Sequence, residues 1–219
     1  MVTKELLKRG GALLAIVCFT SVYATAKNDL FSIKQGDPMV LLQEKKTALF
    51  EIDYSQLIVT NSKDHEDDLD FYTWMQAQDE DNDKWLTEWE EKDKAACDKA
   101  FRDHFNDEVK KGIRLTKLGK HYKVTLRLNM IDFGPAVKMK LTGFSGGEAT
   151  ANGELEVRDL NTDEVVLVLA FTNLKGESSF KQIGRLKGIF ENLGEELSDY
   201  LKDYQKEYEK LQKKLRKTK

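Results

Sequence analysis

The C-terminal part of the chain carries the pattern that most constrains the fold. From Ile183 to Leu215, apolar residues recur at steps of three and four, which is the spacing of one face of an α-helix. A helix from Ser178 to Lys217 is about 60 Å long, whereas a strand of about ten residues spans only about 33 Å. We therefore expect about four or five turns to extend beyond the domain. The apolar positions are Ile183, Leu186, Phe190, Leu193, Leu197, Tyr200, Tyr204, Tyr208, Leu211 and Leu215.

The rest of the chain has strand patterns on both sides of one further helix. A second helical period runs from about Asn82 to Gly112, and alternation or β-branched composition predicts strands elsewhere. This order predicts an α+β fold, with a largely antiparallel sheet of four to five strands and both helices packed on one face. We expect a single domain over 27–200, followed by a basic helical extension over 201–219. The strand ranges are 48–61, 113–118, 122–133, 147–158 and 164–174, of which 113–118 reads as a short strand or a turn.

The first 26 residues have the composition of a secretory signal peptide. Basic residues precede a short apolar run from Ala12 to Phe19, and Ala24-Thr25-Ala26 supplies a small-residue cleavage site. The run is far shorter than the roughly 20 residues that a membrane-spanning helix needs. Cys18 follows Val17 rather than a small residue, which argues against lipid attachment at Cys18. We expect an exported, soluble protein, periplasmic or secreted, that begins at Lys27.

The charge balance argues against a nucleic-acid partner. Removing residues 1–26 leaves 32 basic and 37 acidic residues, a formal charge of about −5. Only Cys97 remains as a cysteine, so no disulfide can form within the chain. Cys97, Phe101 and Phe105 have the spacing of one helical face, which predicts a buried thiol.

No set of residues matches a known catalytic pattern. The three histidines, His65, His104 and His121, fall in an acidic stretch, in a predicted helix and at the start of a strand. Such scattered positions do not predict a metal site or a catalytic triad. We therefore predict a protein with no catalytic residues and no cofactor.

One acidic segment resembles a calcium-binding loop. Asp79, Asp81, Asp83 and Glu90 occupy positions 1, 3, 5 and 12 of an EF-hand loop. Position 6, however, is Lys84 where the loop needs glycine. Aspartates before a helix also complement its positive N-terminal end. The segment therefore has two readings, a calcium site or metal-dependent enzyme site over 79–90, and a helix start, of which we favour the second.

The basic end of the long helix is the main candidate contact surface. From Lys210 to Lys219 the chain has six Lys or Arg residues and no acid. Such charge stabilises the negative end of a helix, and it also attracts anionic lipid or an acidic partner. The apolar stripe from Leu201 to Leu215 could serve self-association, a partner helix, or packing back on the domain. The candidate residues are Tyr204, Tyr208, Leu211, Leu215, Lys213, Lys214, Arg216 and Lys217.

Several motifs carry a family resemblance. They are Phe50-Glu-Ile-Asp-Tyr54, Trp85-x-x-x-Trp89-Glu90, Phe101-x-x-x-Phe105-Asn106, Tyr122-Lys-Val-Thr-Leu126 and Asn129-Met-Ile-Asp-Phe-Gly134. With the signal peptide, they resemble a group of small uncharacterised secreted proteins of Gram-negative bacteria, and more distantly the periplasmic modules of envelope-associated lipoproteins. The resemblance implies a sheet with helices on one face, and it carries over no functional residue. We expect a non-catalytic binding or assembly module, with calcium binding and self-association through the C-terminal helix as alternatives.

Overall fold

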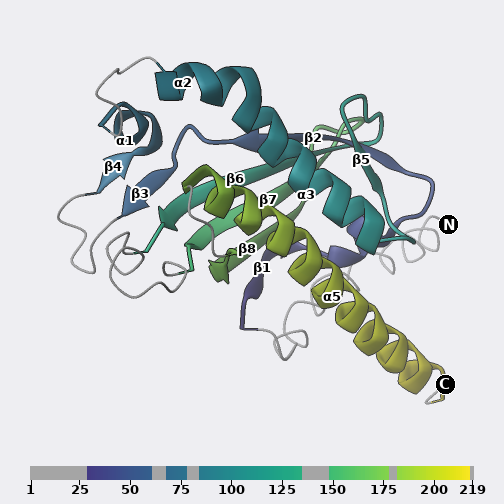
Figure 1. Ribbon diagram of the computed structural model, residues 1–219. Helices are drawn as coiled ribbons and strands as arrows, with labels where there is room; N and C mark the ends of the chain where they lie inside the picture. The colour runs from purple at the N-terminus through teal and green to yellow at the C-terminus, as the bar shows by residue number, and fades with distance from the viewer. Residues whose placement is uncertain (1–28, 61–67, 78–83, 135–147, 178–181, 218–219) are drawn as a thin grey trace, which may run out of the picture.

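The computed structural model describes residues 29–60, 68–77, 84–134, 148–177 and 182–217. Among these residues, eight strands form one sheet with helices on one side (Figure 1). The strands are β1 (Phe31–Gly36), β2 (Thr47–Asp53), β3 (Ile58–Thr60), β4 (Leu69–Asp70), β5 (Arg114–Thr116), β6 (Tyr122–Asp132), β7 (Thr150–Asp159) and β8 (Val165–Lys175). The helical elements are η1 (Pro38–Leu42), α1 (Phe71–Ala77), α2 (Lys84–Glu88), η2 (Trp89–Asp93), α3 (Lys94–Glu108) and α5 (Gln182–Lys217).

The sheet is mixed, and its main path runs β1-β8-β7-β6-β2-β5. Neighbours from β1 to β6 along this path are antiparallel, whereas β2 is parallel to both β6 and β5. Strand β3 continues beside β6 in the parallel direction and pairs with β4. The α+β prediction is confirmed in outline, but the prediction of four to five strands is wrong, because the described residues alone form eight.

The extra strands have identifiable physical causes. The single strand predicted over 48–61 is broken into β2 and β3 by a turn after Asp53. The Asp53 carboxylate accepts a hydrogen bond from the Ser55 N–H at 2.9 Å, and the Leu57 N–H donates to the Tyr54 carbonyl at 3.2 Å. Such a side-chain cap stabilises a turn in place of a continuing ladder.

The helix predicted over 82–112 is present from Lys84 to Glu108 as α2, η2 and α3 in succession. η2 is a π-helical turn, and its Trp89 is fully buried. Cys97, Phe101 and Phe105 are buried on one face of α3, as their spacing predicts. Before this helix lies α1, whose Phe71, Trp74 and Met75 are buried.

Helices α3 and α5 cover the same face of the sheet (Figure 1). Phe50 of β2 stacks on Phe101 of α3 with ring centroids 4.9 Å apart. Toward the other edge of the sheet, the ring of Phe31 in β1 lies 5.1 Å from the ring of Tyr200 in α5. These contacts bury the apolar positions of the strands, so the polar positions of β2, β6 and β7 lie on the opposite face.

The long helix α5 extends beyond the sheet, as its length predicts (Figure 1). Its 36 residues span about 54 Å. Buried residues continue as far as Tyr204, and none of the residues from Gln205 to Lys217 is buried. We call Gln205–Lys217 the projecting segment.

Candidate functional site

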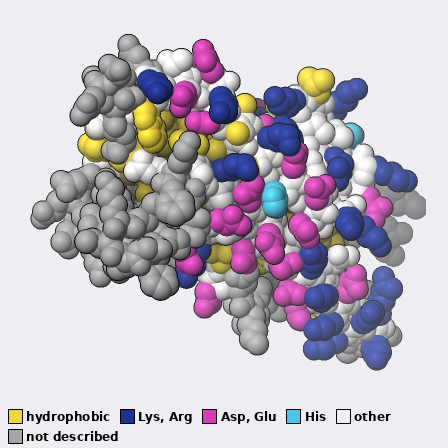
Figure 2. All heavy atoms as spheres, in the orientation of Figure 1, with side chains coloured by type: hydrophobic (Ala, Val, Ile, Leu, Met, Phe, Trp, Pro, Cys, Tyr) yellow, Lys and Arg dark blue, Asp and Glu magenta, His cyan; other side chains and the backbone are white. Residues whose placement is uncertain are grey.

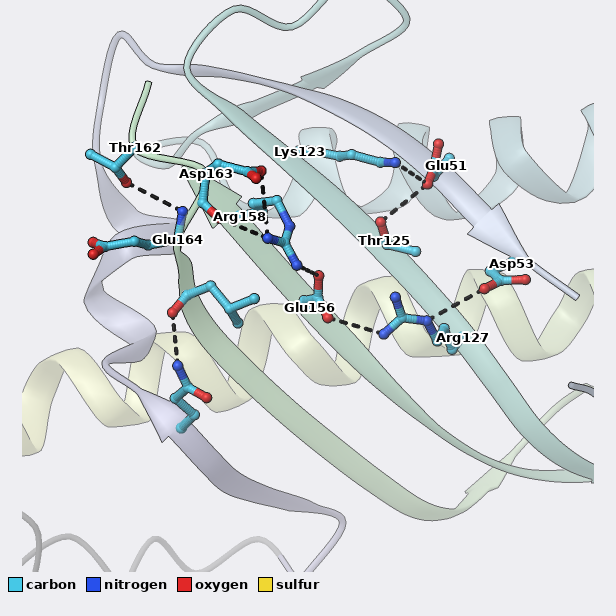
Figure 3. A network of polar contacts seen from close by, with 12 residues as sticks. Glu51, Asp53, Lys123, Thr125, Arg127, Glu156, Arg158, Thr162, Asp163 and Glu164 are labelled. Atoms are coloured by element: carbon cyan, nitrogen blue, oxygen red, sulfur yellow. Dashed lines mark hydrogen bonds and ion pairs between the residues drawn. The ribbon is translucent and has the colours of Figure 1, made fainter. Parts of the chain in front are cut away.

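Two surfaces formed by the described residues are rich in charged side chains. The first is the sheet face opposite the helices, where polar side chains of β6 project. Val124, Leu126 and Leu128 are buried against the helices, and Lys123 and Arg127 lie on the other face. Figure 3 shows Lys123 and Arg127 meeting acidic side chains from β2 and β7.

These side chains form one separate ion pair and one chain of ion pairs that runs across three strands and a turn, and together we call them the sheet-face network. Lys123 Nζ lies 2.6 Å from Glu51 Oε1, and Arg127 Nε lies 3.4 Å from Asp53 Oδ2. Arg127 Nη1 also donates to Glu156 Oε2 at 3.1 Å, while Arg158 Nη2 lies 3.2 Å from Glu156 Oε1. Arg158 Nη1 reaches the carboxylate of Asp163 at 3.5 Å. The members are Glu51, Asp53, Lys123, Arg127, Glu156, Arg158 and Asp163.

The network lowers the pKa values of two of its carboxylates, Glu156 and Asp53. Burial acts to raise the pKa of Glu156, but the hydrogen bonds and charges of Arg127 and Arg158 outweigh it and hold the pKa below the usual 4.5. Hydrogen bonds from Ser55 and then the Arg127 guanidinium lower the pKa of Asp53. A general acid or base at neutral pH needs a pKa near 7, so these shifts move both groups away from proton transfer.

The remaining candidates for chemistry are held apart. Burial raises the pKa of the Cys97 thiol to about 12, which keeps it protonated and unreactive. His104 is exposed on α3, with Nε2 3.9 Å from Glu191 Oε1. His121 Nδ1 accepts the Thr47 N–H at 3.1 Å, a structural contact beside β2. His65 lies outside the described residues.

The proposed calcium loop is only partly within the described residues. Asp79, Asp81 and Asp83 lie outside them. Glu90 is an exposed residue of η2, and Lys94 Nζ lies 3.2 Å from its Oε2. Within the described ranges, no group of three or more His, Cys, Asp or Glu side chains is placed to hold a metal ion.

The second surface is α5 and its projecting segment. Tyr204 is buried and packs beside Tyr200 with ring centroids 6.1 Å apart, so it belongs to the domain and not to the projecting segment. Tyr208 and Leu211 are half-buried, and Leu215 is 46% exposed. The basic candidates Lys213, Lys214, Arg216 and Lys217 are all exposed. The candidate contact residues are therefore the seven beyond Tyr204.

The net charge along α5 changes sign after Tyr204, where the projecting segment begins. Glu191–Asp203 contains five acids and one lysine, whereas Gln205–Lys217 contains six basic residues and two acids. These two stretches of 13 residues have net charges of −4 and +4. Figure 2 shows acidic side chains over the helix layer and basic side chains over the end of α5. Ion pairs at i, i+3, such as Lys206 with Asp203 at 2.8 Å and Lys210 with Glu207 at 2.7 Å, stabilise the helix where it leaves the domain.

Comparison with known proteins adds little to this description. No family model and no curated protein matches the sequence. Two matching solved structures are dodecamers of PelC from Paraburkholderia phytofirmans. They are 10% and 13% identical to this chain, with TM-scores of 0.35 and 0.38. Each match covers 75% of this chain, and 93% and 96% of the PelC chains. Scores this low support no statement about this protein.

The described part of the chain has no helix with the length and apolar content needed to span a bilayer.

The sheet-face network was not predicted from the sequence, although its central strand was expected over 122–133. Pairing of Arg127 with both Asp53 and Glu156 depends on the register of β6 against β2 and β7. Nothing in the local sequence specifies that register.

Proposed function

We propose that the protein is an exported, non-catalytic assembly module that pairs with a second copy of itself through α5. One observation carries the proposal, namely the opposite net charges of Glu191–Asp203 and Gln205–Lys217. If two α5 helices lie antiparallel, the acidic stretch of each faces the basic stretch of the other. A two-fold axis makes both contacts at once, as in most homodimers.

The charge pattern specifies a register as well as a direction. A two-fold axis between Tyr204 and Gln205 sets five exposed charged residues of 195–203 opposite five exposed residues of opposite charge in 206–214. The pairs are Glu195 with Lys214, Glu196 with Lys213, Asp199 with Lys210, Lys202 with Glu207, and Asp203 with Lys206.

This arrangement differs from a zipper formed by the apolar stripe. Beyond Tyr204 the stripe consists of Tyr208, Leu211 and Leu215, too few side chains to bury the roughly 1,200 Å² of a standard interface. Two projecting segments side by side would also bring two stretches of net charge +4 together. Exposed ion pairs contribute little each, about 0.2–1 kcal/mol, so the proposed pairing is weak and sensitive to salt.

The absence of catalysis is part of the proposal. The ionisable groups with shifted pKa values are moved away from neutrality, as for Glu156 and Cys97. The charged side chains of the sheet-face network pair with one another. Export is proposed from the signal sequence over 1–26, and N-terminal sequencing of the protein from a periplasmic or secreted fraction should begin at Lys27.

Light scattering of the chain from Lys27 tests the pairing. At low ionic strength we expect a mass that rises with concentration toward a dimer, and at high salt a monomer. Glu195→Lys/Glu196→Lys and Lys213→Glu/Lys214→Glu should each be monomeric, because each places like charges in opposition. The exposed pair Lys84 and Lys92, changed to glutamate, is a matched control that should not alter the mass.

A mixture of the two charge-reversed variants is the decisive sample. In the antiparallel register, the lysines introduced at positions 195 and 196 of one chain face the glutamates introduced at positions 213 and 214 of the other, and the second contact retains its natural charges. The mixture should therefore recover the dimer. A monomeric mixture, or a dimer in either variant alone, would contradict the proposed pairing.

A further inference from the structure

The connection from β5 to β6 carries an exposed hydrophobic residue, Leu118. Leu118 is 86% exposed, the highest value of any large hydrophobic residue in the described ranges. Strands β5 and β6 pair with β2 on its two sides, since Ala48 is the partner of both Leu115 and Tyr122. The connection Lys117–His121 therefore has to cross over β2.

The crossing holds this loop rigidly. A Cβ atom on Gly119 would lie 1.9 Å from the carbonyl carbon of Ala48, so the loop backbone lies directly on β2. On the far side, the Lys120 N–H donates to Thr47 Oγ1 at 3.2 Å, and the His121 N–H donates to the Thr47 carbonyl at 3.0 Å. Before the crossing, the Leu118 N–H donates to Thr116 Oγ1 at 3.2 Å. Leu118 is thus exposed on an anchored loop.

The stretch of chain that contains the loop is strongly basic. From Val109 to Lys123 the chain has six basic residues and no acid, although the protein as a whole is acidic. Lys110, Lys111, Lys117 and Lys120 are exposed, and in the described part of the chain none of the four forms an ion pair. Figure 2 shows Lys and Arg side chains gathered over the end of the molecule that carries β5 in Figure 1.

Two neighbouring segments lie beside the loop, and one of them adds basic residues. The Arg114 N–H donates to the Lys46 carbonyl at 2.9 Å, which brings the start of β2, with Lys45, beside β5. The Leu160 N–H donates to the His121 carbonyl at 3.0 Å, so the β7–β8 turn is the other neighbour.

Two of the four acids in these adjoining segments have a polar partner. Asp159 accepts the Asn161 N–H at 2.7 Å, and Asp163 pairs with Arg158 at 3.5 Å. Glu44 and Glu164 are the remaining acids in these adjoining segments, fewer than the basic residues.

We propose that this loop docks on an anionic lipid surface, with Leu118 inserted among the acyl chains and the surrounding lysines against the headgroups. A single exposed leucine in a basic stretch of chain has too little apolar area for a specific protein interface. A fluid bilayer needs no matching shape, and it supplies negative charge and apolar depth together. This surface is separate from α5, so its test is independent of the self-pairing.

Vesicle flotation tests the proposal with phosphatidylglycerol–phosphatidylcholine vesicles and with phosphatidylcholine vesicles alone. We expect binding only to the anionic vesicles. Leu118→Ser should weaken it about tenfold, because a leucine side chain loses its burial. Lys117→Glu/Lys120→Glu should weaken it by more than about tenfold, and the loss should shrink as salt rises. Inorganic phosphate should not compete at millimolar concentration.

Exposed residues elsewhere in the chain provide matched controls. Leu215→Ser removes another exposed leucine, and Lys84→Glu/Lys92→Glu reverses two exposed lysines that belong to neither proposed surface; both should retain binding within about twofold. Circular dichroism identifies any variant that fails to fold. Equal binding by Leu118→Ser and the natural chain overturns the insertion. Loss of binding only in the variant with both Lys213 and Lys214 reversed assigns membrane contact to α5 and overturns the proposal.

A fluorescence measurement gives a second, independent readout. In Leu118→Trp, brominated lipids in anionic vesicles should quench the new tryptophan and shift its emission to shorter wavelength. Leu215→Trp should show neither change. An unquenched tryptophan at position 118 in vesicle-bound protein would show that the loop does not enter the bilayer.

Discussion

Replacement of Glu156 by glutamine tests the energetic description of the sheet-face network. Glu156 accepts from Arg127 at 3.1 Å and lies 3.2 Å from Arg158, and its side chain is only 16% exposed. Glutamine retains the size and removes the charge. Both arginines keep one acidic partner, Asp53 and Asp163 respectively, so the substitution weakens the network without isolating a cation.

The expected cost lies between two limits. Hydrogen bonds to charged groups contribute about 1.5–3 kcal/mol when well shielded, and exposed ion pairs about 0.2–1 kcal/mol. The arginines are about one-third exposed, at 35% and 34%, so we discount the upper limit and expect Glu156→Gln to lower the free energy of unfolding by about 1–2 kcal/mol. For a domain of this size, this lowers the Tm by about 2–8 °C.

The lowered pKa of Glu156 determines how the stability difference between the natural protein and Glu156→Gln changes with pH. Because the pKa of Glu156 is lower in the folded state than its ordinary 4.5, its stabilisation is present above that value and is lost as the pH falls through the folded pKa. The stability difference between the natural protein and Glu156→Gln should therefore be full at pH 7 and shrink steadily as the pH falls below 4.5.

Urea denaturation at a series of pH values measures both quantities. Glu154→Gln is the matched control, since Glu154 projects from the same face of β7 and forms no ion pair within the described residues. It should change the free energy of unfolding by less than about 0.5 kcal/mol. The description of the network is refuted if Glu156→Gln costs no more than Glu154→Gln, or if its cost is the same at about pH 7 and about pH 3.

Other parts of the molecule give three further predictions. Gly119→Ala should destabilise the fold by about 1–3 kcal/mol in thermal unfolding, because its Cβ would lie 1.9 Å from Ala48; unchanged stability would argue against the tight crossing of β2. In the chain from Lys27, Cys97 should react with a thiol reagent only after unfolding, since burial raises its pKa to about 12; rapid reaction of the native protein would contradict this. Calorimetric titration should detect no micromolar Ca²⁺ binding, because the chain is helical from Lys84 and Glu90 pairs with Lys94; binding that Asp79→Ala abolishes would favour the calcium-loop reading.

Local periodicity was sufficient to predict the longest elements. Strand β6, expected over 122–133, runs Tyr122–Asp132, and β8, expected over 164–174, runs Val165–Lys175. The apolar steps of α5 predicted both the helix and its extension past the sheet. These features depend on residues close together in the chain, which is why a sequence pattern records them.

Features that depend on distant residues were not predictable. β1 takes its place by pairing with β8, where Phe31 is the partner of Phe171, and no pattern in Phe31–Gly36 identifies that partner. The parallel pairing of β2 with β6 likewise requires the whole fold. At the candidate surfaces, the charge division of α5 is visible in the sequence, whereas the exposure of Leu118 results from the crossing over β2.

Spin–spin distances between two copies test the antiparallel pairing of α5 most directly. Labels at Gln205 and, separately, at Lys217 fall outside the five proposed charge pairs, and Cys97 is buried and stays unlabelled. With a two-fold axis beside Gln205 and a rise of about 1.5 Å per residue, labels at Gln205 should lie within about 15 Å of each other and labels at Lys217 about 40 Å apart. Short distances at both positions would mean a parallel zipper, and no dipolar signal at low salt would mean no pairing; either result contradicts the proposal.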